Sequence, residues 1–153
     1  MAEPFDTRLV AALDLAGEMA RFAAGASPDE GAQASFAGLC RAATGAGEPL
    51  LALVLETYRS MTLASMQEIM AAARGRFAVS RGVIVHAHGR IAPGAPIVWV
   101  GFAASHRRAA LDAVDYAMDR LKSDAIFWKR EETASGAAWI EPTAQDYDHK
   151  ARW

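Results

Sequence analysis

The chain has 153 residues, of which 52% are hydrophobic and 22% are charged, and its formal net charge at pH 7 is −2. The length and composition predict one globular domain over residues 1–153, and the small negative charge argues against a nucleic-acid or membrane partner. Cys40 is the only cysteine, which excludes an intrachain disulfide. We find no signal peptide and no apolar run near the ~18 residues of a membrane span, so we expect a cytoplasmic protein.

The N-terminal part predicts a short strand over 7–13 and a helix over 15–24. Asp14 suits the N-cap of this helix, because its carboxylate can accept hydrogen bonds from the first turn. The apolar residues at helical spacing are Leu15, Met19 and Phe22. The following stretch, 25–31, contains Gly and Pro and predicts a loop.

Two apolar stretches, 32–40 and 50–58, predict strands that pair as an antiparallel hairpin. The second stretch is almost entirely apolar, so we expect both of its faces to be buried. Ser60 is then a candidate N-cap for a helix over 61–74. The expected buried stripe of that helix consists of Leu63, Met66, Ile69, Met70 and Ala73.

The second half predicts strands over 82–88 and 97–104 and then the strongest helix of the chain, over 106–122. Ser105 is the candidate N-cap of this helix. Its apolar stripe consists of Ala110, Val114, Ala117, Met118 and Leu121. The polar residues expected on its solvated face are Asp112, Asp115, Asp119 and Arg120.

A strand over 126–130 follows, with a partner strand over 137–141 beyond the turn at Gly136, and the polar tail after Pro142 predicts one or two turns of helix. Strands and helices are therefore mixed, and several strands are close neighbours along the chain. This order favours an α+β fold with a mainly antiparallel sheet and packed helices over a doubly wound parallel sheet.

The lysines are unevenly distributed. Only three of the 16 basic residues (Lys plus Arg) are lysines, and two of them, Lys122 and Lys129, bracket an aromatic pair seven residues apart. An arginine stays charged, whereas the pKa of a lysine shifts when it is desolvated or placed beside other cations. The pair is either a proton-transfer site or an ordinary exposed loop, and on this stretch alone the two interpretations carry equal weight.

The sequence His106-Arg107-Arg108 places cations at a helix N-terminus, which already carries partial positive charge. Such a pattern favours a bound anion there over arginines that reach away to surface carboxylates. The helix spans about 24 Å, so His106 and Lys122 of one chain are too far apart for one small ligand. A long ligand or a second chain would join them.

Other chemistry-bearing residues have plainer interpretations. His86 and His88 share one face of a strand, but no further ligand stands at a suitable spacing, so we expect core or surface histidines and no metal. Cys40 lies in an apolar strand and is expected to be a buried, inert thiol. No dinucleotide or phosphate-loop glycine motif and no nucleophile elbow is present.

From about residue 30 onward the chain resembles the large, catalytic subunit of molybdopterin synthase. Short motifs occur in the family's order and spacing. They are Gly31-Ala32 with Phe36-Ala37-Gly38-Leu39-Cys40-Arg41, Leu55-Glu56-Thr57-Tyr58-Arg59-Ser60-Met61, Ser105-His106-Arg107, Leu121-Lys122, and Phe127-Trp128-Lys129-Arg130-Glu131. The chain departs from the family pattern at Ala87, at 42–45 and at Asp124-Ala125-Ile126.

The resemblance implies an α+β fold with a hammerhead-type β motif and a sulfur transferase of molybdenum cofactor biosynthesis. The family installs the two dithiolene sulfurs of molybdopterin on cyclic pyranopterin monophosphate, without a further cofactor. A small ubiquitin-like carrier subunit brings the sulfur as a thiocarboxylate on its C-terminal Gly-Gly. The large subunit works as a homodimer with one carrier at each end.

By motif position, the resemblance implies that Lys122 and Lys129 are catalytic. It assigns substrate binding to Arg41, His106, Arg107 and Phe36. Two other functions are compatible with the sequence: a non-catalytic paralogue that binds the carrier, and a generic phosphate-binding α+β domain. The lysine pair argues against the second, and the retention of both lysines with Arg41 and His106 argues against the first.

Overall fold

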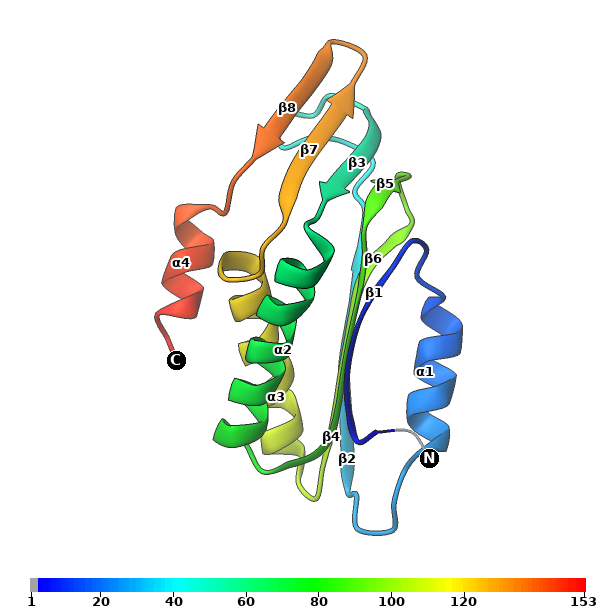
Figure 1. Cartoon of the computed structure of the whole chain (residues 1–153), viewed down its shortest axis with the longest axis vertical. Coiled ribbons are helices and arrows are strands. Elements are labelled where there is room, and N and C mark those ends of the chain that lie inside the picture. Colours follow the sequence, from blue (N-terminus) through cyan, green and yellow to red (C-terminus); the bar gives the residue numbers. More distant parts are fainter. Residues whose placement is uncertain (1–2) are drawn as a thin grey trace.

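The computed structural model describes residues 3–153 (Figure 1). Its elements in chain order are β1 (Phe5–Val10), α1 (Leu15–Ala24), β2 (Ala32–Leu39), β3 (Leu50–Glu56), α2 (Arg59–Arg76), β4 (Val79–Ala87), β5 (Gly89–Ile91), β6 (Pro96–Ala104), α3 (Arg107–Ser123), β7 (Trp128–Thr133), β8 (Gly136–Ile140) and α4 (Ala144–Lys150). Among these residues no helix is long and apolar enough to cross a membrane.

The strands form two four-stranded sheets with the orders β1-β4-β6-β2 and β5-β3-β7-β8. Every pair is antiparallel except β1–β4, so the predicted α+β class with a mainly antiparallel sheet is confirmed. Figure 1 shows α2 and α3 on one face of the first sheet and α1 on the other. The main core lies between this sheet and α2 and α3, and includes Met66, Ile69, Phe102 and Ala117.

The predicted hairpin of 32–40 with 50–58 is wrong. β2 pairs with β6, whereas β3 lies in the other sheet between β5 and β7. β3 is almost entirely apolar and β2 has polar side chains only at Gln33 and Ser35, so neither pattern identifies a partner. Strands distant in sequence provide the hydrogen bonds. Leu51 of β3 is 57% exposed, so the expectation that both faces of this strand are buried fails at that end.

The helix boundaries were better predicted than the caps. Asp14 caps α1 as expected, because its Oδ1 accepts a hydrogen bond of 3.0 Å from Gly17 N–H. Ser60 and Ser105 are not caps: α2 begins after Tyr58 and α3 after His106, and neither N-cap side chain bonds the helix. These two helices therefore begin without a side-chain cap, and the packing of their apolar faces supplies most of their stability.

Two polar residues that periodicity places at the surface are buried. Glu18 takes the inward place expected for Met19, because Arg8 and Arg21 both donate hydrogen bonds to its carboxylate. Asp119 was expected on the solvated face of α3 but is only 8% exposed. The tail covers it: Arg152 and the indole N–H of Trp153 both donate to Asp119 Oδ2, each at 2.6 Å.

Candidate functional site

Lys122 and Lys129 lie at the two ends of one short turn. Lys122 belongs to the last turn of α3, and Lys129 is the second residue of β7, opposite Leu55 of β3 and Ile140 of β8. Lys122 is exposed and Lys129 is partly buried. The end of a helix and the start of a sheet strand therefore present both ammonium groups to one region.

Lys129 is the most perturbed lysine of this region. Burial, and then repulsion by the Lys122 ammonium, lower the pKa of Lys129 from 10.5 to about 8, while the Asp146 carboxylate opposes the shift. Near neutral pH, Lys129 can therefore both donate and accept a proton. The two lysines therefore differ: Lys122 is exposed, and burial lowers the pKa of Lys129.

His86, at the end of β4, lies beside this pair. Its ring is 6% exposed and stacks on Phe127, with ring centroids 4.1 Å apart. Its Nδ1 lies 2.7 Å from the carbonyl oxygen of Ala87 and donates to it. Burial, helped by the charges of Lys129 and Lys122, lowers the pKa of His86 to about 4. At neutral pH the imidazole is therefore uncharged and adds no third cation.

Helix α2 holds the turn between the lysines. Thr62 Oγ1 donates to the carbonyl oxygen of Ile126 at 2.6 Å, and Ile126 N–H donates to Ser65 Oγ at 3.1 Å. Asp124 accepts hydrogen bonds from Arg120 and from Lys150. The departure from the family pattern at 124–126 is thus a turn with its own set of contacts.

Helix α4 contributes an acidic group. Asp146 completes a capping box with Thr143 at the start of α4. Burial opposes the shift, but hydrogen bonds from Thr143 and the charges of Lys122 and Lys129 together lower the pKa of Asp146. A carboxylate from the tail therefore balances part of the positive charge of the lysine pair.

The other predicted residues belong to α3 and to β2 with the residues that follow it. His106 and Arg107 begin α3, and both are exposed. The 17 residues of α3 separate them from Lys122 by about 24 Å, as expected from the helix rise. Phe36 is 41% exposed on β2, and Arg41 is exposed just beyond that strand. One chain therefore does not bring His106 and Arg107 to the lysine pair, and the anion site at the helix start stays a prediction.

Cys40 is 4% exposed, which confirms that this cysteine is buried, and burial raises the pKa of its thiol. That the thiol is unreactive stays a prediction. Within residues 3–153, no group of three or more His, Cys, Asp or Glu side chains is arranged to hold a metal ion, so His86 and His88 are not part of such a group.

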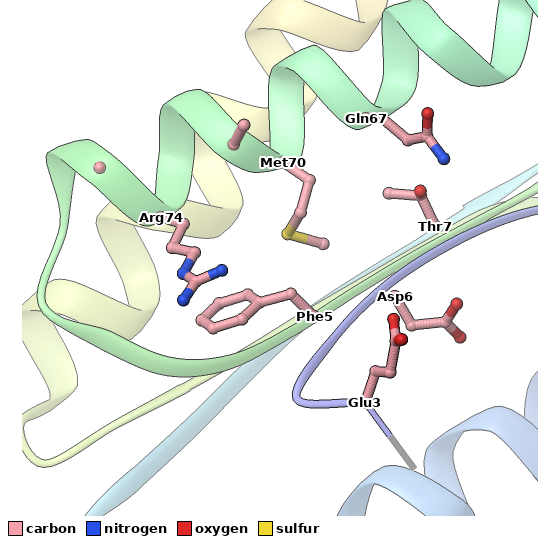
Figure 2. A pocket seen from close by; sticks show the side chains of 9 residues that line it. Glu3, Phe5, Asp6, Thr7, Gln67, Met70 and Arg74 are labelled. Atoms are coloured by element: carbon pink, nitrogen blue, oxygen red, sulfur yellow. The ribbon is translucent and has the colours of Figure 1, made fainter.

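A hollow of about 600 Å³ lies between β1 and α2, away from the predicted residues (Figure 2). Phe5 and Thr7 line it from β1, and Met70 and Arg74 line it from α2. The Arg74 guanidinium lies over the Phe5 ring, 4.7 Å from the centroid, so this cation already has a partner. Glu3 and Asp6 also line the hollow, which contains none of the residues predicted for the site.

The sequence does not predict a role for Thr62, Ser65 or Asp146, nor the closeness of His86 to the lysines. Thr62 and Ser65 are hydroxyl residues within a helix, and no local pattern marks their bonds to a turn more than sixty residues away. A capping box at Thr143 is visible in the sequence as Thr-x-x-Asp, but its closeness to the lysines is not.

Comparison with known proteins identifies the family. The family model described as MoaE protein matches residues 10–124. The molybdopterin synthase catalytic subunit of Caulobacter vibrioides is 50% identical over 125 residues, which cover 82% of this chain and 81% of that protein. A solved structure, the molybdopterin biosynthesis MoaE protein from Burkholderia ambifaria MC40-6, is 34% identical with a TM-score of 0.77, covering 99% of this chain and 98% of the other.

A more distant structure has the same fold. One chain of the protein–protein complex of subunits 1 and 2 of molybdopterin-converting factor from Helicobacter pylori 26695 is 17% identical with a TM-score of 0.74, covering 88% of this chain and 89% of the other. The family model covers most of the chain, and the Caulobacter subunit matches it at half of the aligned positions. The chain therefore belongs to the MoaE family, the catalytic subunits of molybdopterin synthase, a sulfurtransferase of molybdenum cofactor biosynthesis.

Proposed function

We propose that this chain transfers sulfur from the C-terminal Gly-Gly thiocarboxylate of a small ubiquitin-like carrier to cyclic pyranopterin monophosphate, in the cytoplasm and without a further cofactor. The observation that carries the proposal is the tuned lysine pair. Lys129 has a pKa of about 8 next to the exposed Lys122, in a chain whose net charge is negative. Carrier and substrate are both anions, and a local cationic site suits them.

The two lysines have different tasks in this proposal. Lys122 is exposed, so it meets the incoming carrier tail and holds the thiocarboxylate. The thiocarboxylate sulfur forms a bond to a substrate carbon as the bond from that carbon to oxygen breaks, and the departing oxygen takes up a proton. Water then cleaves the bond between the carrier acyl carbon and sulfur, which leaves sulfur on the substrate and a carboxylate on the carrier. The hydroxide of that water goes to the acyl carbon, and its proton must be moved. Lys129, with a pKa near neutrality, is the group suited to shuttle it.

The site is completed, in this proposal, by a second copy of the chain. Arg41, His106, Arg107 and Phe36 bind the pterin and its phosphate. His106 lies about 24 Å from Lys122 along α3, so a neighbouring chain in a homodimer supplies it. The carrier partner is supported by the Helicobacter pylori structure, whose title describes a complex of two subunits.

Reconstitution tests the reaction and the site separately. Purified chain, thiocarboxylated carrier and cyclic pyranopterin monophosphate are mixed, and the dithiolene product is measured. Lys122→Ala and Lys129→Ala are expected to lose at least about a hundredfold in turnover, as for groups that act in the transition state. Arg74→Ala, which removes an exposed cation from the hollow between β1 and α2, is the matched control and is expected to turn over normally.

No product from the wild-type protein would contradict the sulfur transfer. Normal turnover of both lysine variants would contradict only the site. A mixture tests the shared site: equal amounts of Lys129→Ala and His106→Ala, exchanged into mixed dimers, are expected to regain about a quarter of wild-type activity. No recovery would show that each chain builds its site alone.

A further inference from the structure

The turn 124–127 sets the distance and direction between the two lysines. Lys122 is held by α3 and Lys129 by the hydrogen bonds of β7, and residues 124–127 between these elements belong to neither. A change in this turn therefore moves one ammonium group relative to the other. The residues that hold the turn decide whether the pair keeps its geometry.

Helix α2 satisfies both main-chain polar groups of Ile126. The Thr62 hydroxyl donates to its carbonyl oxygen, and Ser65 Oγ accepts from its N–H while donating to the carbonyl oxygen of Thr62 at 2.7 Å. Thr62 is fully buried and Ser65 is 9% exposed. Burying a hydroxyl without a hydrogen-bond partner costs free energy. The main chain of the turn supplies that partner for Thr62 and Ser65.

Strand β4 holds the next residue of the turn. The His86 ring stacks on Phe127 with an angle of 29° between the ring planes, two residues before Lys129. The Nδ1–H bond to Ala87 fixes the orientation of the imidazole. We propose that Thr62, Ser65 and His86 are positioning residues that fix Lys129 relative to Lys122 through the turn 124–127. The inference rests on the catalytic role proposed for the lysine pair.

The protonation of Lys129 reports on this geometry. Its ammonium faces Lys122 from α3, Asp146 from α4 and the neutral His86 from β4. Burial is the largest cause of its lowered pKa. If the turn loosens, water reaches the amine, and the pKa of Lys129 rises toward the ordinary lysine value.

The experiment compares Thr62→Val, which keeps the shape and loses the hydroxyl, with Thr62→Ser, which keeps the hydroxyl. The pH at which Lys129 is half reactive is measured by competitive acetylation of the native chain and mass spectrometry, below the unfolding temperature of each variant. We expect this midpoint to rise by about one pH unit in Thr62→Val and to stay near 8 in Thr62→Ser. In Thr62→Val, kcat should fall about tenfold, while KM for the pterin should stay within twofold of the wild-type value.

Ser65→Ala is the second variant, and it is expected to shift the midpoint in the same direction. Ser80→Ala is the control. It removes a hydroxyl near the start of β4, away from His86, that donates to the carbonyl oxygen of Ala103, and it should change neither the Lys129 midpoint nor kcat. An unchanged Lys129 midpoint in both Thr62→Val and Ser65→Ala would overturn the inference. The labelling needs no substrate, so this outcome is separate from a failure of the proposed sulfur transfer.

Discussion

Replacing Lys129 by methionine should make the protein more stable at neutral pH. The folded state lowers the pKa of Lys129 from 10.5 to about 8, so between these values the unfolded chain binds more protons. The charged Lys129 therefore lowers the free energy of unfolding. This destabilisation is fully present below pH 8 and disappears as the pH rises through 10.5. Methionine has a similar length and no charge, so Lys129→Met removes the penalty.

The size of this effect follows from the shift. Each pKa unit corresponds to ~1.36 kcal/mol, so a drop from 10.5 to about 8 costs the folded state about 3 kcal/mol at pH 7. For a chain of 153 residues this predicts a rise in Tm of roughly 6–12 °C in Lys129→Met. At pH 10.5 only the pH-independent part, such as better apolar packing, should remain.

Urea unfolding of wild type and Lys129→Met at pH 7 and pH 10.5, at one fixed protein concentration, measures the difference. Other groups that titrate over this range cancel between the two proteins. Lys150→Met is the control: this lysine pairs with Asp124, and its removal should give no stabilisation at pH 7. An equal gain in the free energy of unfolding for Lys129→Met at both pH values would refute the reasoning, because the folded state would then not disfavour the charged form of the Lys129 amine.

Three further predictions concern buried groups outside the lysine pair. Glu30→Ala should cost about 3 kcal/mol in urea unfolding, because the Glu30 side chain is 2% exposed and its loss leaves Arg81 without its carboxylate; a loss below about 0.5 kcal/mol would contradict this. Asp119→Ala should cost about 2 kcal/mol in the same assay, because Trp153 Nε1 loses its acceptor, and an unchanged midpoint would argue against that bond. Cys40, at 4% exposure, should react with a thiol reagent at least about a hundredfold more slowly in the native protein than in urea, and equal rates would show that the thiol is accessible.

Local signals in the sequence were sufficient for most elements. The predicted helix over 15–24 coincides with α1, because Asp14 and Gly25 mark its ends chemically. The predicted helix over 106–122 is displaced from α3 by one residue, since apolar spacing fixes a face better than an end. Strand pairing could not be derived this way. The residues of β2 and β3 do not identify a partner, because β6 pairs with β2 and β7 pairs with β3 from far along the chain.

The candidate site could be predicted only in part, again because some of its contacts join residues that are distant in sequence. Composition and motif order marked Lys122 and Lys129, and burial then distinguishes them, with Lys129 the perturbed one. The hydroxyls of Thr62 and Ser65 carry no sequence signal, because their partner Ile126 is far along the chain. Such residues become visible only when the packing of a helix against a distant turn is known.

The parallel pair of β1 with β4 has a consequence for how the chain folds. Phe5 pairs with Gly82, so the two strands are 77 residues apart along the chain. Closing a loop of this length costs about 4 kcal/mol of chain entropy before any pairing energy is returned. On a ribosome, the first strand to emerge waits until β4 has left the exit tunnel. β2 waits longer still, because its partner β6 lies beyond β4 in the chain, and long-range closure of this kind slows folding.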